Sequence, residues 1–133
     1  MRRPPTVWVH TTSRPATAIR PSKVIYDRKH SAITEYDFSG LDLDELLDGF
    51  DWLHLSGITP ALAPNCRQLV LSSLKAARAK GMTISFDGNF RSSLWTWEQA
   101  RDFCTLCLPY IDVLLASNPI ICGATRAIIA KAM

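Results

Sequence analysis

Several features that would point to a membrane or a nucleic acid are missing from this sequence of 133 residues. It has no apolar run long enough to cross a bilayer, and no charged-then-apolar secretory leader opens it. It has no run of five like charges, and aromatic residues do not interleave its basic ones. We therefore expect a cytoplasmic protein that binds neither membranes nor nucleic acids.

Residues with the spacing of metal ligands are also scarce. Of the four cysteines, Cys104 and Cys107 form a C-x-x-C pair, but no second pair or suitably spaced histidines complete a zinc site. The pair falls on the apolar face of a predicted helix, with Trp97, Ala100 and Leu108. We expect no metal site and interpret both cysteines as small buried apolar residues rather than as a redox or metal-binding pair.

The composition is that of an ordinary globular protein with one modest core. Apolar residues make up 47% of the chain and charged residues 20%, with a net charge of +3. Basic residues crowd the first thirty positions and acidic residues the next thirty. We interpret these charges as solvated faces.

The N-terminal part predicts a β-hairpin. Residues 1–21 are poorly specified, although residues 7–9 could form a short strand. Strand-forming residues at 23–28 and 32–36 are separated by three polar positions and predict two paired strands. Because a two-stranded ribbon is marginally stable alone, the hairpin must pack on more strands or cover a cleft.

From residue 42 onward the pattern alternates between helix and strand. Asp42 and Glu45 can form a capping box before an apolar stripe of Leu43, Leu46, Leu47 and Phe50, and Thr96 and Gln99 can form another. The expected elements are helix 43–50, strand 52–56, loop 57–60, helix 64–80, strand 82–86, helix 96–108 and strand 111–116.

Two consecutive βαβ units predict a parallel sheet with right-handed crossovers. The loops at 57–60, 87–91 and 117–118 should then lie at one edge of the sheet. Asp87, Asn89 and Arg91 follow the central strand there, which suits an anionic, hydroxylated small molecule. An ordinary surface turn is the alternative, because Asp, Gly and Asn are common turn residues.

Three motifs carry a resemblance to a known family. Residues 20–28 read RPSKVIYDR, residues 53–62 read LHLSGITPAL, and residues 87–91 read DGNFR, with Leu94 and Trp95 following. Together these motifs resemble the PfkB, or ribokinase-like, carbohydrate kinases, in particular the 2-keto-3-deoxygluconate kinase branch. The resemblance covers roughly residues 20–116.

The resemblance implies a partial ribokinase-like α/β fold, with a parallel βαβαβ core and a small β-hairpin lid. It divides the chain into an N-terminal segment 1–21, a partial kinase domain 22–116 and a divergent tail 117–133. Within the kinase domain, residues 22–36 would form the lid and residues 42–116 the core. The implied reaction is ATP-dependent phosphorylation of a sugar acid, with ATP and Mg as cofactors of the full-length family.

The resemblance also implies which residues bind the substrate. Tyr26 and Arg28 would reach from the lid, with Arg28 directed at the carboxylate, while Ile58 and Arg91 would contact the sugar from the core. A planar guanidinium suits this task because it binds a carboxylate through two parallel hydrogen bonds. Each residue has a structural alternative: a packed aromatic for Tyr26, a solvated side chain for Arg28 and a partner of Asp87 for Arg91.

The same resemblance assigns Asp87 and Asn89 an organising role and leaves no catalytic residue in the sequence. The Gly-Ala-Gly-Asp segment, which in these kinases supplies an anion hole and a base, is absent, and residues 123–126 read GATR instead. Without either part, essentially all phosphoryl transfer should be lost. We expect the chain of 133 residues to bind neither ATP nor Mg on its own.

Three interpretations remain open. The chain could be an enzyme fragment that is inactive alone. It could be a binding module that recognises a sugar acid or associates with a full-length kinase or with itself. It could also be a gene remnant whose exposed sheet edge makes it prone to aggregation.

Overall fold

The computed structural model describes residues 10–14, 23–28 and 30–115 of the chain. The chain forms two compact units, residues 1–37 and residues 38–133. The predicted segment 1–21 is described only at 10–14, and the predicted tail 117–133 lies outside the described residues. Within the described ranges, helices with the length and apolar character of a bilayer crossing are absent.

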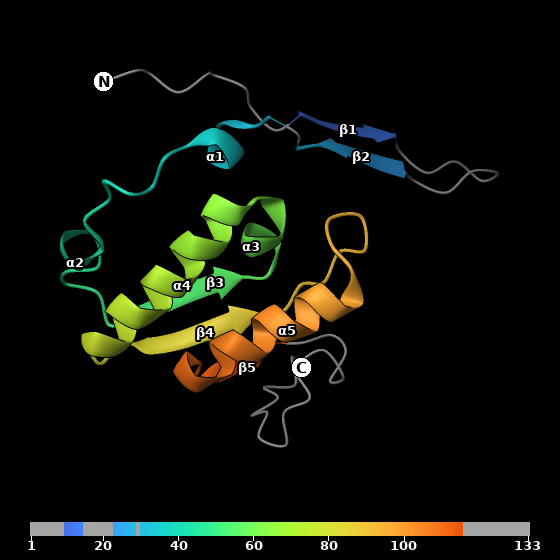
Figure 1. Ribbon diagram of the computed structural model, residues 1–133. Coiled ribbons are helices and arrows are strands. Elements are labelled where there is room, and N and C mark those ends of the chain that lie inside the picture. The colour runs from blue at the N-terminus through green and yellow to red at the C-terminus, as the bar shows by residue number, and fades with distance from the viewer. Residues whose placement is uncertain (1–9, 15–22, 29, 116–133) are drawn as a thin grey trace. The chain divides into compact units, whose positions relative to one another are not determined.

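The first unit contains a β-hairpin, but its strands differ from those predicted (Figure 1). Strand β1 (His10–Arg14) pairs antiparallel with β2 (Lys23–Asp27). The predicted strand 32–36 is wrong, because residues there form the short helix α1 (Ala32–Glu35). Strand β1 was not predicted, because its sequence HTTSR has no alternation of apolar and polar residues.

A local turn explains why residues 32–36 do not extend the hairpin. His30 has a φ of 55°, which turns the chain, and Ser31 is only 1% exposed. The carbonyl oxygen of Ser31 accepts hydrogen bonds from both the backbone N–H (2.9 Å) and the hydroxyl (2.7 Å) of Thr34. These bonds close a helical turn and override the strand preference of the residues that follow.

The second unit contains a parallel sheet in the order β3-β4-β5, formed by β3 (Trp52–Ser56), β4 (Thr83–Asp87) and β5 (Val113–Leu115). Helices α4 (Pro64–Ala79) and α5 (Trp97–Cys107) make the two crossovers and lie on one face of the sheet (Figure 1). The 3-10 turn η1 (Leu108–Tyr110) leads from α5 to β5. This confirms the predicted parallel βαβαβ core.

The core lies between the sheet and these two helices. Ile84 and Phe86 of β4 are 0% and 1% exposed, and they pack with a cluster of buried residues from both helices. The predicted buried face of α4 is confirmed at Cys66, Val70, Leu74 and Ala77. Cys104 and Cys107 are both buried. Cys107 is a free thiol, and burial raises its pKa to about 12. Cys104 is disulfide-bonded, so its interpretation as a plain apolar residue is wrong. No group of three metal-ligating side chains occurs among the described residues.

The helix ends follow the capping signals in the sequence. Thr96 and Gln99 form a complete capping box at the start of α5. Asp42 accepts the backbone N–H groups of Asp44 and Glu45, each at 3.0 Å, and so begins α2 (Leu43–Leu46). Gly81 lies just after the C-terminal end of α4 and has a φ of 71°, a backbone conformation that favours glycine after a helix.

Two predicted segments are wrong in the second unit. The helix expected at 43–50 ends at Leu46, because the chain turns at Gly49 (φ 77°), and Leu46 and Phe50 are 54% and 64% exposed. The loop expected at 57–60 is a turn of helix, α3 (Ile58–Leu62). In addition, β4 begins one residue later than expected, and β5 is shorter than the predicted 111–116.

Candidate functional site

The carboxyl ends of β3 and β4 bring two loops together. Ser56 and Asp87 are the last residues of these strands and are opposite one another in the parallel register. The backbone N–H of Gly57 donates to the carbonyl oxygen of Asp87 over 2.7 Å, which carries the pairing one residue past the strand. The loop predicted at 117–118 on this edge lies outside the described residues.

Asp87 and Asn89 shape the loop that follows β4. Asn89 has a φ of 35°, and its backbone N–H donates to Oδ1 of Asp87 over 3.1 Å. Its side-chain amide donates to the hydroxyl oxygen of Ser56 over 3.4 Å, at the long end of hydrogen bonding. Both side chains therefore take part in holding the loop, and their organising role toward a ligand stays a prediction.

Ile58 and Arg91 lie on the two loops of this edge. Ile58 is half-buried as the first residue of α3, and its backbone N–H donates to the hydroxyl of Ser56 over 3.4 Å. Arg91 is exposed and donates to the carbonyl oxygen of Phe90 over 3.0 Å. The described residues include no ion pair between Arg91 and Asp87, so the alternative of an internal pair is not what the structure shows.

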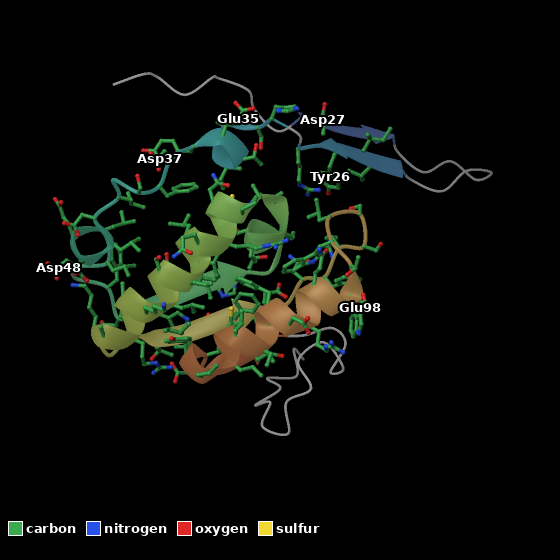
Figure 2. The ribbon with its side chains drawn as sticks, viewed as in Figure 1. Tyr26, Asp27, Glu35, Asp37, Asp48 and Glu98 are labelled. Atoms are coloured by element: carbon green, nitrogen blue, oxygen red, sulfur yellow. The ribbon has the colours of Figure 1, made fainter. Side chains whose placement is uncertain are left out.

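Tyr26 and Arg28 belong to the first unit and contact each other. The guanidinium carbon of Arg28 lies 4.1 Å from the centre of the Tyr26 ring, which is a cation–π contact. Tyr26, labelled in Figure 2, is 53% exposed, so it is not a packed strand aromatic. Their predicted substrate contacts stay predictions, because the structure describes each unit by itself.

Sequence reasoning missed two residues that fix the α3 turn. Ser56 accepts from both loops, and Arg67 of α4 donates from Nε to the carbonyl oxygen of Pro60 over 3.0 Å. The Arg67 guanidinium also lies 5.6 Å from the centre of the Trp95 ring. The position of Ser56 at the end of a strand was a usable signal, whereas the Arg67 contacts depend on tertiary packing.

The cavity behind these loops is too small for a sugar. It is lined by Gly57, Phe86, Gly88 and Trp95 with residues of α5, and its volume of about 10 Å³ has room for roughly one water molecule. Arg91, two residues after Asn89, is exposed.

Similarity to known proteins supports a kinase origin for this arrangement. The chain is 41% identical to 2-dehydro-3-deoxygalactonokinase of Haloferax volcanii over 76% of its own length and 31% of that protein's. It is 48% identical to 2-dehydro-3-deoxygluconokinase of Escherichia coli strain K12 over 57% of its length and 28% of that protein's. The sugar acid in the name of the Escherichia coli enzyme, 2-dehydro-3-deoxygluconate, is the same compound as 2-keto-3-deoxygluconate.

Solved structures agree with these relatives. The crystal structure of 2-dehydro-3-deoxygluconokinase from Thermotoga maritima matches with a TM-score of 0.77 and 42% identity, over 81% of this chain and 33% of that one. A PfkB family carbohydrate kinase from Listeria grayi matches with a TM-score of 0.78 and 35% identity, over 83% and 34%. The homologues and structural neighbours of this chain are PfkB-family carbohydrate kinases.

This result confirms the resemblance to PfkB kinases and the partial ribokinase-like fold. No protein-family model matches the sequence. The chain spans about a third of the length of the curated relatives it matches, at 31% and 28%.

Proposed function

We propose that the chain carries part of the substrate site of a PfkB sugar kinase acting on 2-keto-3-deoxygluconate or a closely related sugar acid. The observation that carries this proposal is the meeting of the α3 turn and the Asp87–Arg91 loop at one edge of the parallel sheet. Arg91 would bind oxygens of the sugar acid, and Ile58 would pack against its carbon skeleton. Arg28, with Tyr26, would supply the second guanidinium from the hairpin.

Phosphoryl transfer is not expected from these 133 residues alone. The sequence has no Gly-Ala-Gly-Asp segment, and therefore neither the anion hole nor the base that the resemblance associates with catalysis. Transfer of a phosphoryl group depends on positioning and on stabilising negative charge, so both losses act on the chemical step. ATP and Mg would act in a whole kinase of this kind, and sugar-acid binding is the activity left to this chain.

Calorimetric titration with 2-keto-3-deoxygluconate tests the proposal directly. The Arg28→Ala and Arg91→Ala double variant should lose at least tenfold in affinity, since each charge-assisted hydrogen bond contributes about 1.5–3 kcal/mol. Arg101→Ala is the matched control, because Arg101 is an exposed arginine that pairs with its neighbour Asp102 on α5. No heat from the unmodified chain would contradict sugar-acid binding, and ATP turnover would contradict the inactive assignment.

A second candidate function is association with a full-length kinase or with another copy of this chain. Phe50, which precedes β3, and Trp52, the first residue of β3, are 64% and 57% exposed, and β3 is an edge strand of the described sheet. Parallel sheets are normally covered on both faces, and the crossover helices of this sheet lie on one (Figure 1). Exposed aromatic residues at an edge strand favour a protein partner.

Sedimentation of the purified chain, alone and mixed with a full-length kinase, distinguishes these partners. Trp52→Ser with Phe50→Ser should abolish any complex. Leu106→Ser is the control, because Leu106 is 60% exposed on α5, the helix that connects β4 to β5 and not to β3. A complex that survives the double substitution would exclude this surface, and a chain that is monomeric under both conditions would exclude the association.

A further inference from the structure

We propose that Gly57 is a positioning residue, which holds the α3 turn and the Asp87–Arg91 loop together as one preassembled surface. The inference rests on the proposed function, in which these two loops bind the sugar acid. It concerns a residue that contacts no ligand itself. Gly57 would act through two residues: Ile58, which follows Gly57 itself, and Asn89, which follows the neighbouring Gly88.

Position 57 requires glycine because there is no room for a side chain. Its φ and ψ of −64° and −9° are ordinary helical values that any residue can adopt. A Cβ at this position, however, would lie 2.2 Å from the carbonyl oxygen of Gly88, 2.9 Å from its carbonyl carbon and 3.3 Å from the carbonyl oxygen of Asp87. All three are backbone atoms, so no side-chain rotation can relieve the clash. Any larger residue must push the two loops apart.

Hydrogen bonds on both sides keep this contact in place. The Gly57 N–H donates to the carbonyl oxygen of Asp87 over 2.7 Å, and the Gly88 N–H donates to that of Leu115 over 2.8 Å. Gly88, whose carbonyl group faces Gly57, is therefore tied to β5 through its N–H, and Gly57 is tied to β4. A displacement at the contact must move Ile58, Asn89 or both, because each is the next residue along the chain.

The hydroxyl of Ser56 adds a second link between the same loops. It accepts from the Ile58 backbone N–H and from the Asn89 side-chain amide, both over 3.4 Å. These long bonds are individually weak. They have the right partners, however, to keep the α3 turn and the loop after β4 in register once the glycine contact has brought them together.

Three glycine substitutions separate positioning from general loss of stability. Gly57→Ala should shift the backbone amide resonances of both 58–62 and 87–91 and weaken sugar-acid binding at least tenfold. Gly81→Ala introduces strain at a φ of 71° where nothing lies within 4 Å, so it should lower the thermal midpoint and leave both loops unchanged. Gly40→Ala, which also meets nothing within 4 Å, should change neither.

The outcomes distinguish this inference from the proposed function. If Gly57→Ala leaves the amide resonances of 87–91 unchanged, the positioning role is wrong, whatever the affinity. If the unmodified chain binds no sugar acid while Gly57→Ala still disturbs both loops, the coupling stands and the proposed function fails.

A milder pair of variants covers the case in which Gly57→Ala does not fold. Ser56→Ala should speed hydrogen exchange of the Ile58 amide roughly fivefold, as expected for one lost hydrogen bond, and should move the Asn89 side-chain amide resonance. Ser56→Thr, which keeps the hydroxyl, should restore both. Unchanged exchange and an unmoved resonance in Ser56→Ala would overturn the coupling of the loops.

Discussion

The carboxylate of Asp112 accepts a hydrogen bond of 2.8 Å from the backbone N–H of Ile84, a fully buried residue of the neighbouring strand β4. The backbone of Asp112 returns a bond of 2.9 Å to the carbonyl oxygen of Ile84. Arg78 of α4 donates to the same carboxylate over 3.0 Å. Asp112 therefore joins the start of β5 to both β4 and the helix packed on them.

Removing this carboxylate should destabilise the second unit. Asp112→Ala leaves the buried Ile84 N–H without its acceptor, which costs about 1–3 kcal/mol of unfolding free energy. Asp112→Asn should cost less, because its amide oxygen can still accept. Urea denaturation followed by fluorescence measures both, with Asp102→Ala as the control, since Asp102 is an exposed aspartate on α5. Equal stability of Asp112→Ala and the unmodified chain would contradict the role.

The same residue predicts a dependence of stability on acid. The Ile84 N–H, and next the Arg78 guanidinium, lower the pKa of Asp112 below its ordinary value of 3.8. Because the folded state favours the ionised form, the contribution is fully present above the ordinary value and is lost as the pH falls through the lowered one. The side chain is 40% exposed, so solvent screening keeps the effect small.

Denaturation midpoints at a series of pH values test this dependence. The stability difference between the unmodified chain and Asp112→Asn should be constant near neutral pH and should shrink below about pH 4. A difference that stays constant down to pH 2 would show that the Asp112 charge contributes nothing.

The long, periodic elements could be predicted from sequence, and the short ones could not. Helix α4 was predictable because buried residues recur along one face and Gly81 follows its end; α5 was predictable from its capping box. The errors fall at 32–36, 43–50 and 57–60, where the true elements have four or five residues. Over so few residues, one turn such as that at His30 decides the structure more than propensity does.

The candidate site shows the same division. That the loops after β3 and β4 share an edge follows from parallel strands, so Asp87, Asn89 and Arg91 could be selected in advance, whereas Ile58 was selected through the family resemblance. The Gly57–Gly88 contact could not, because a glycine needed for space looks the same in sequence as one needed for a turn. Only the distance between the two backbones distinguishes them.

The hydrogen bonds of the Ser85 hydroxyl predict which ring nitrogen of His54, on β3, carries the proton. The indole Nε1–H of Trp52 donates to the Ser85 hydroxyl oxygen over 2.8 Å, and Nδ1 of His54 lies 2.8 Å from the same oxygen. Because the indole can only donate, the hydroxyl keeps its own proton, and we predict that it donates this proton to Nδ1, so that neutral His54 carries its proton on Nε2. Nitrogen-15 shifts of the imidazole should show this tautomer, and Ser85→Ala should change them while Ser72→Ala should not. A neutral ring protonated on Nδ1 would contradict this assignment.

The contact between Tyr26 and Arg28 yields a prediction about the hairpin. The Tyr26 ring, 4.1 Å from the Arg28 guanidinium, restricts the guanidinium before any ligand arrives. A cation–π contact at an exposed site contributes about 0.5–1 kcal/mol, so Tyr26→Leu should weaken sugar-acid binding roughly two- to fivefold. Tyr26→Phe keeps the ring face and should bind almost normally unless the hydroxyl itself contacts the ligand.

Calorimetry of both variants separates the effect of the ring from that of the hydroxyl. Tyr36→Leu is the control, because Tyr36 is another exposed tyrosine of the same unit. Equal affinity of Tyr26→Leu and the unmodified chain would mean that Arg28 acts without its aromatic support, or not at all.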